Sequence, residues 1–188
     1  MTHEEIKHWL DKHGIEHYTI RPDSIVDVTG HVNIRDLNEP SFPFQFGKVT
    51  GTFDCNYGNI TSLIGAPESV GVGCAGIYTG GGFSCHSTMV SSLQGAPQYV
   101  NGSFSCYGTN IISLTGVDKI IKQINGRFLC SADVTHLLGL LLIKGITSFN
   151  IDAHGPIDKI FNKYVGTGDI LSAQDELIDA GFIDQARL

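Results

Sequence analysis

An internal repeat constrains the fold of this sequence more than any other feature. The pair Phe-x-Cys occurs four times in the 188 residues, and each copy is followed by Ile or Val and then by Leu at nearly constant offsets. The four copies start at Phe53, Phe83, Phe104 and Phe128. Weaker copies at Val32 and Phe149 extend the series at both ends after steps of 21 residues. Such a period predicts a solenoid in which each repeat forms one coil.

Two steps in the series exceed the period, and both surpluses fall between the expected strands. Phe53 and Phe83 are 30 residues apart, and the surplus lies in the segment GVGCAGIYT at 71–79. The step from Phe104 to Phe128 is 24 residues, and its surplus lies within TGVDKIIKQ. Because insertions confined to turns leave the stacking of coils intact, we interpret residues 25–152 as one repeat solenoid.

The alternation within each unit predicts one short strand per coil. Phe and Cys stand two residues apart, so both side chains point to the same face of a strand. The following Ile and Leu also point inward, and Gly-Ala-Pro then ends regular structure. Stacked coils of this kind predict an α/β solenoid with one parallel sheet of about six short strands around a continuous core. We expect a single domain over residues 1–188.

Both ends of the chain carry helix signals, and a solenoid needs its terminal coils covered. Thr2 and Glu5 form a capping box, and Gly14 ends the helix that it starts, which predicts a helical cap over residues 1–14. Pro156 can open a helix and Asp169 can begin a second one. We therefore expect a C-terminal helical cap over residues 156–188.

The repeat unit resembles the leucine-rich repeat, whose core phrase is L-x-x-L-x-L-x-x-N-x-L. The Asn position departs from that phrase and holds Gly58, Thr88, Thr109 and Asp133. The phrases NITSLIGAPESV and GSFSCYGTNIISL look more narrowly like a group of short, leucine-rich-repeat-like proteins encoded by bacteriophages. This resemblance implies a right-handed solenoid that acts inside an infected bacterium, with a host protein as its partner.

The repeated cysteines have a structural explanation. Cys55, Cys85, Cys106 and Cys130 occupy the same inward slot in successive coils, where a small apolar residue is needed. Neighbouring side chains on one face run parallel, which disfavours disulfides between coils, and a ladder does not place four sulfurs at the corners of a tetrahedron. We expect buried, reduced thiols, no metal and no cofactor.

Composition limits the classes of partner. The net charge of −7 disfavours direct nucleic-acid binding, which needs a basic face. The longest apolar run, Leu137–Ile143, is too short to span a bilayer, and the N-terminal segment is charged rather than an apolar leader. We therefore expect no membrane association and a cytoplasmic location, which is the host cytoplasm if the protein is encoded by a phage.

The outward positions of the strands form the first candidate site. Residues that alternate with the core point to solvent, such as Thr52, Asp54 and Asn56 in one coil. From this set we select a binding face for a protein partner that consists of Asp54, His86, Ser105, Tyr107 and Arg127. No catalytic set can be assembled from neighbouring repeat positions, so we expect a non-catalytic, protein-binding module that inhibits or redirects a host protein.

Three alternatives remain open. The insertion contains the pattern G-x-G-x-x-G but no helix is expected after it, so it is a weak nucleotide motif. Its residues Gly73, Cys74 and Tyr78 would form the site if the protein captured a nucleotide signal. An enzyme of unknown type is a further alternative. The acidic residues of the C-terminal segment would suit a basic surface of a host protein: Asp169, Asp175, Glu176, Asp179 and Asp184.

Overall fold

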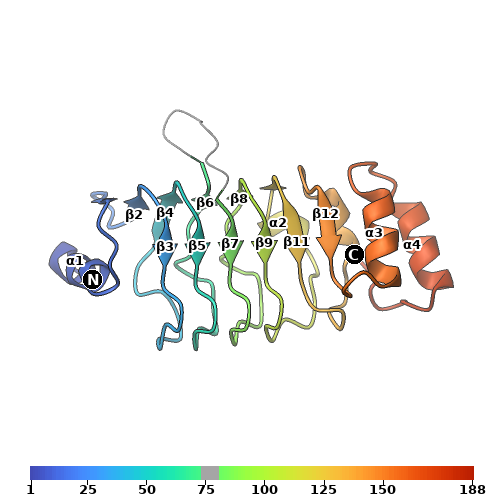
Figure 1. Ribbon diagram of the computed structural model, residues 1–188, viewed down its shortest axis with the longest axis horizontal. Coiled ribbons are helices and arrows are strands. Elements are labelled where there is room, and N and C mark those ends of the chain that lie inside the picture. The colour runs from blue at the N-terminus through green and yellow to red at the C-terminus, as the bar shows by residue number, and fades with distance from the viewer. Residues whose placement is uncertain (73–80) are drawn as a thin grey trace.

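Successive repeats form stacked coils, and together they build a β-solenoid of about six turns (Figure 1). The computed structural model describes residues 1–72 and 81–188. Helix α1 (His3–Lys12) lies at the N-terminal end of the stack, and helices α3 (Pro156–Tyr164) and α4 (Ile170–Asp179) lie at the other end (Figure 1).

Each complete coil contributes two short strands, one to each of two six-stranded sheets. Sheet A has the order β1-β2-β4-β6-β8-β10, and its strands are Tyr18–Ile20, Val26–Val28, Phe46–Val49, Ser69–Val70, Tyr99–Val100 and Gln123–Ile124. Sheet B has the order β12-β11-β9-β7-β5-β3, and its strands in chain order are Val32–Asn33, Phe53–Asp54, Phe83–Ser84, Phe104–Ser105, Arg127–Leu129 and Ser148–Asn150. All pairs are parallel except β1 with β2.

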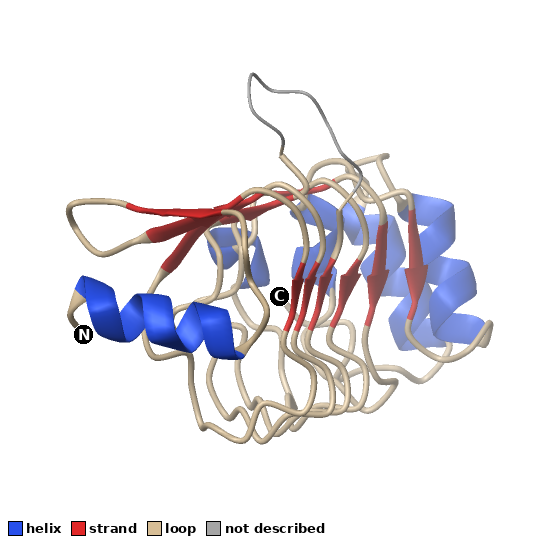
Figure 2. Ribbon diagram, turned by 60° about the vertical axis from the view of Figure 1, so that its left-hand side comes forward, coloured by secondary structure: helices blue, strands red, loops and turns tan. Residues whose placement is uncertain are grey.

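The expectation of a single sheet with one strand per coil was wrong. The Phe-x-Cys strands form sheet B, but the apolar residue that precedes each of them also lies in a strand. Val28, Val49 and Val70 are buried in sheet A, where Val49 lies opposite Val70. The two sheets occupy different sides of the coil (Figure 2).

Glycine makes the sharp corner between the two sheets possible. Gly51 stands between β4 and β5, and a Cβ added there would lie 2.6 Å from the carbonyl oxygen of Gly30 in the preceding coil. Gly126 occupies the same corner later in the chain, where an added Cβ would lie 2.5 Å from the backbone of Gly102. Any other residue would push the backbones of neighbouring coils apart at these corners.

Stacked phenylalanine rings form the centre of the core. The ring centroids of Phe53 and Phe83 are 5.7 Å apart, those of Phe83 and Phe104 are 5.1 Å apart, and those of Phe104 and Phe128 are 5.4 Å apart. All four rings are buried. Because equivalent residues pair across parallel strands, one sequence position becomes one continuous row in the core.

The prediction of buried cysteines is confirmed. Cys55, Cys85, Cys106 and Cys130 are buried free thiols beside the phenylalanine row. The Cys55 Sγ donates to the carbonyl oxygen of Ser84 in the next coil at 3.3 Å, and the Cys106 Sγ donates to that of Leu129 at 3.5 Å. Burial raises the pKa of Cys106 to about 12, and burial also raises the pKa of Cys55, Cys85 and Cys130.

Helix α1 begins at the predicted capping box, in which Thr2 and Glu5 exchange hydrogen bonds. The helix buries Ile6, Trp9 and Leu10, and the Trp9 ring meets Phe44 edge to face at 5.2 Å. The strand pair β1 and β2 follows the helix, although the sequence offered no clear hairpin.

Helix α3 packs on the outer edge of β12, the last strand of sheet B. The Asn162 side chain accepts from the backbone N–H of Phe149 at 2.7 Å and donates to the carbonyl oxygen of the same residue at 3.1 Å. The buried Asp158 carboxylate accepts from the backbone N–H of Ile151 at 2.5 Å and of His154 at 2.7 Å. These side chains satisfy backbone groups that a further strand would otherwise pair.

Two short helical segments interrupt the coils near the second insertion. Helix α2 (Val117–Ile120) falls within TGVDKIIKQ, and the 3₁₀ segment η2 (Leu138–Leu142) lies in the long apolar run. Neither was predicted. Helix α4 begins after Asp169, whose carboxylate accepts from the Ser172 N–H as the sequence suggested.

The phenylalanine row should carry much of the stability. We expect Phe104→Ala to lower the free energy of unfolding by about 3–5 kcal/mol, because the cavity would open between two stacked rings. Ser105→Ala, on the outward side of the same strand, is the matched control and should change stability by less than about 0.5 kcal/mol. Urea titration followed by circular dichroism measures both, and equal losses would contradict this account of the core.

The buried thiols should resist modification. In a Cys74→Ser variant, which removes the cysteine outside the described residues, we expect no reaction of the native protein with a disulfide reagent at about pH 8, because the raised pKa values keep the thiolate form scarce. All the remaining cysteines should react once denaturant exposes them. A thiol that reacts rapidly in the native protein would show that the cysteine row is open to solvent.

Candidate functional site

A groove of about 800 Å³ lies on the outward face of sheet B, towards its C-terminal end. Three of the five residues selected from the sequence lie together there, namely His86, Ser105 and Tyr107. The groove is completed by Leu129, Ser131, Ala132, Asp133, Asn150, Ile151, Asp152 and Ala153. The groove therefore crosses four successive coils rather than belonging to one loop.

The repeat explains how these residues meet. His86 and Tyr107 each follow the inward cysteine of their coil, so both point outward at the same position of the repeat. The backbone N–H of Ser87 donates to the carbonyl oxygen of Tyr107 at 2.9 Å, which ties the two turns together. Ser131 and Asp152 occupy the same repeat position in the next two coils and extend the row.

Asn56 stands at the equivalent position in the preceding coil, but its predicted outward orientation was wrong. Its side chain is only 3% exposed. The Oδ1 atom accepts from the hydroxyl of Ser84 at 2.7 Å and from the backbone N–H of His86 at 2.8 Å. The Asn56 side chain is therefore buried against the following coil, where it fixes the backbone that presents His86.

Tyr57 borders the groove and was missed in the sequence. Its ring meets the His86 ring edge to face at 4.7 Å, and the side chain is 55% exposed. Tyr57 also has a positive φ of 62°, in the left-handed region that favours glycine or asparagine. The sequence pattern does not reveal this backbone conformation, so it did not mark Tyr57 as part of the surface. With Tyr107, which is 57% exposed, Tyr57 flanks His86 with aromatic surface.

The opposite end of the groove is acidic. Asp133 is exposed, and Asp152 is partly buried at the turn before α3. The Asp152 carboxylate accepts from the backbone N–H groups of Ile157 at 2.9 Å and Asp158 at 3.0 Å, so the start of the helix holds it in place. Among the described residues that line the groove, none is Lys or Arg. This end therefore favours a cationic group.

The other two residues of the predicted sheet face do not join the groove. Asp54 lies on β5 and accepts from the guanidinium of Arg35 at 2.7 Å, while Arg127 is exposed at the start of β11. Neither lines the groove. The second predicted site, formed by Gly73, Cys74 and Tyr78, lies outside the described residues.

The acidic C-terminal residues do not form one unpaired patch. Glu176 contacts Lys163 and accepts from the Tyr164 hydroxyl at 2.8 Å. The hydrogen bond from Lys163 is the main cause that lowers the pKa of Glu176, and the hydrogen bond from Tyr164 lowers it further. Asp184 pairs with Arg187 at 3.2 Å, and Asp169 caps α4. These partners give the residues structural roles within the C-terminal helices.

Comparisons with protein-family models, curated proteins and solved structures found no match to this chain. None of the helices in the described part of the chain is both long and apolar enough to cross a bilayer. Within residues 1–72 and 81–188, no three His, Cys, Asp or Glu side chains converge as a metal ion would require. The groove itself therefore provides the basis for a functional proposal.

Asn56 should be needed to hold the groove in shape. We expect Asn56→Ala to destabilise the fold by about 1–3 kcal/mol, because the Ser84 hydroxyl and the His86 N–H would lose their buried acceptor. Asn33→Ala on the exposed edge strand β3 is the control and should have little effect. Thermal unfolding of both variants measures the difference, and an Asn56→Ala protein as stable as Asn33→Ala would refute this role.

Proposed function

We propose that this protein is a non-catalytic binding module that holds a basic segment of a partner protein in the sheet B groove. The observation that carries the proposal is a groove with exposed aromatic rings at one end and carboxylates at the other. Tyr107 lines the groove and Tyr57 borders it, while Asp133 and Asp152 stand at its other end. A segment with more than one Arg or Lys would place one cationic side chain on a ring face and another beside a carboxylate.

Two further features support a protein ligand. The groove is lined by residues from four successive coils, which suits an extended segment better than a small molecule. Exposed tyrosines are enriched at protein interfaces because they offer apolar surface together with a hydroxyl. The net charge of −7 would also draw a basic partner towards the protein.

We infer binding rather than catalysis because the groove offers no complete set of reacting groups. The Nδ1 atom of His86, which lines the groove, lies 3.1 Å from the Oγ atom of the neighbouring Ser87. In the described part of the chain, no carboxylate is hydrogen-bonded to the His86 ring to orient it. A nucleophile and its base normally need such a third group.

The resemblance noted in the sequence gives this proposal its biological setting. We propose a leucine-rich-repeat-like solenoid, encoded by a phage, that binds and inhibits or redirects a host protein in the bacterial cytoplasm. In this proposal the helices at the two ends act as caps that shield the terminal coils from other strands. Two observations support that role. Helix α1 buries its Trp9 side chain, and the Asn162 side chain of α3 forms hydrogen bonds with the backbone of β12.

The proposal predicts a partner whose capture depends on the groove. A tagged protein is used to capture partners from bacterial lysate, and the affinity of a captured protein is then measured with purified components. We expect Tyr107→Ala to weaken that affinity by about tenfold or more, since a central aromatic residue would be removed. Asp133→Asn should weaken it less, and added salt should lower the affinity of the parent protein.

Tyr99→Ala is the matched control, because Tyr99 is a similarly exposed tyrosine on sheet A. The control should retain parental affinity, and circular dichroism should show that all variants are folded. A partner that binds Tyr107→Ala and Asp133→Asn as well as the parent would overturn the assignment of the groove. Turnover of a substrate by the parent protein would overturn the non-catalytic role.

A further inference from the structure

Sheet A carries a second hollow whose chemistry is opposite to that of the groove. It has a volume of about 300 Å³, and the described residues that line it are Lys48, Ser69, Val72, Tyr99, Val100, Asn101, Gln123 and Asn125. These described residues include one lysine and no carboxylate. On a chain with a net charge of −7, such a lining marks a place that suits an anion.

The register of sheet A creates the hollow. Lys48 lies opposite Ser69 in the neighbouring strand, and Ser69 lies opposite Tyr99 in the next. The small serine therefore separates two long side chains, and it forms a floor between them. Because strands are about 4.8 Å apart, the walls stand roughly 10 Å from each other at the backbone. A slot of this width admits one planar ring against the tyrosine, with the lysine on its other side.

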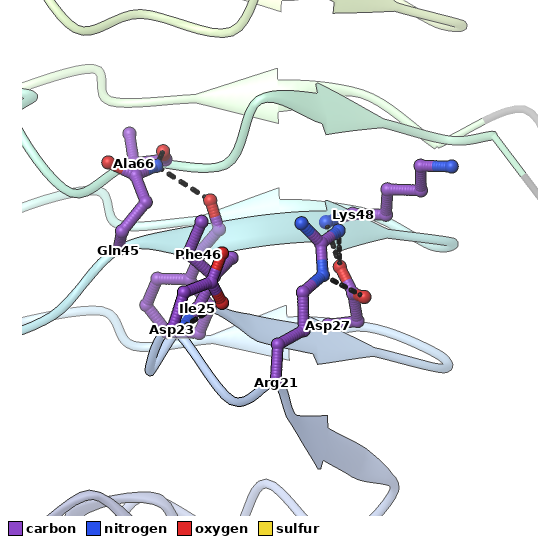
Figure 3. A network of polar contacts seen from close by, with 8 residues as sticks. All are labelled: Arg21, Asp23, Ile25, Asp27, Gln45, Phe46, Lys48 and Ala66. Carbon is purple, nitrogen blue, oxygen red and sulfur yellow. Dashed lines mark hydrogen bonds and ion pairs between the residues drawn. The ribbon is translucent and has the colours of Figure 1, made fainter.

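The positive charge of Lys48 is available to a ligand. Figure 3 shows Asp27 beside it, but the Asp27 carboxylate is bound by the Arg21 guanidinium, with two contacts of 2.7 Å. The Lys48 backbone N–H donates to Asp27 at 2.7 Å, and the Lys48 charge helps to lower the pKa of Asp27 without an ion pair between the two side chains. Within residues 1–72 and 81–188, no carboxylate pairs with the Lys48 ammonium. Figure 3 shows its side chain extending away from the Arg21–Asp27 pair.

Side-chain amides line another wall. The Gln123 Nε2 donates to the Asn125 Oδ1 at 2.8 Å, and the Asn125 Nδ2 donates to the Asn101 Oδ1 at 2.8 Å. This chain of hydrogen bonds fixes the orientation of the amides. It leaves the Asn101 amide N–H groups and the Gln123 carbonyl oxygen without a partner among these three residues. The wall can thus donate to and accept from the edge of a ligand in one plane.

From these features we infer that the sheet A hollow binds a mononucleotide. Tyr99 would stack on the base, the Asn101 and Gln123 amides would bond to its edge, and Lys48 would pair with the phosphate. A planar heterocycle with donors and acceptors on its edge matches the ring face and the amides, and amides of Asn and Gln are well suited to such edges. The inference is independent of the partner proposed for sheet B, because the two hollows share no residue.

The test uses the full-length protein and AMP as the probe, with binding followed by ligand-observed NMR. We expect saturable binding of AMP, weaker binding of adenosine because it lacks the phosphate, and little binding of inorganic phosphate alone. Tyr99→Ala should weaken AMP binding by about tenfold or more, as loss of base stacking does elsewhere. Lys48→Gln should reduce the affinity for AMP towards that for adenosine.

Lys159→Gln is the matched control for Lys48→Gln, because Lys159 is an exposed lysine on α3 that lines neither hollow, and this variant should bind AMP as the parent does. Absence of saturable AMP binding at millimolar ligand would overturn the inference. Equal binding of AMP by the parent, Tyr99→Ala and Lys48→Gln would also overturn it. Glucuronate, an anion whose ring is not planar, is tested as well. If glucuronate binds as tightly as AMP, the hollow is a general anion site and the inference is overturned. These outcomes do not depend on whether the sheet B groove binds a protein.

Discussion

The in-register pairing of each coil with the next is the constraint on which the rest of the structure depends. Phe53 pairs with Phe83, and Phe83 pairs with Phe104, so each position of the repeat meets its own counterpart in the neighbouring coil. Inward positions therefore become rows of like side chains, such as the phenylalanine and cysteine rows. Outward positions also become rows. Both candidate sites lie where the side chains along such a row differ in size or charge from one coil to the next.

The pairing register is the same on both sides of the long insertion. Phe53 and Phe83 are separated by 30 residues, yet their strands pair as directly as those of the regular step. Val72 and Gly81 are the nearest described residues on the two sides of the segment 73–80. The Gly71 backbone N–H donates to the carbonyl oxygen of Val49, in the preceding coil, at 2.9 Å. Surplus residues in a strand would instead have shifted every later side chain to the wrong face.

Much of this fold was predictable from the sequence, because the repeat marks the inward positions directly. The buried phenylalanines and cysteines, the capping box of α1 and the start of α3 at Pro156 all follow from local patterns. The second sheet was missed because its strands have only two to four residues, and such short strands show too little alternation of buried and exposed positions to be recognised. The burial of the Asn56 side chain was missed because its hydrogen-bond partners, the Ser84 hydroxyl and the His86 N–H, lie in the following coil.

The candidate sites were less predictable than the fold, since the repeat specifies which face a residue occupies but not what surrounds it. His86, Ser105 and Tyr107 were placed on the correct face, whereas the nearby acid Asp152 is held by the start of α3, which lies outside the repeat. The hollow on sheet A arises because serine stands between lysine and tyrosine at one register position. At physiological salt, interactions between exposed charges are screened beyond roughly 8 Å. The carboxylates of the sheet B groove and the Lys48 ammonium of the sheet A hollow can therefore act separately on the two sheets.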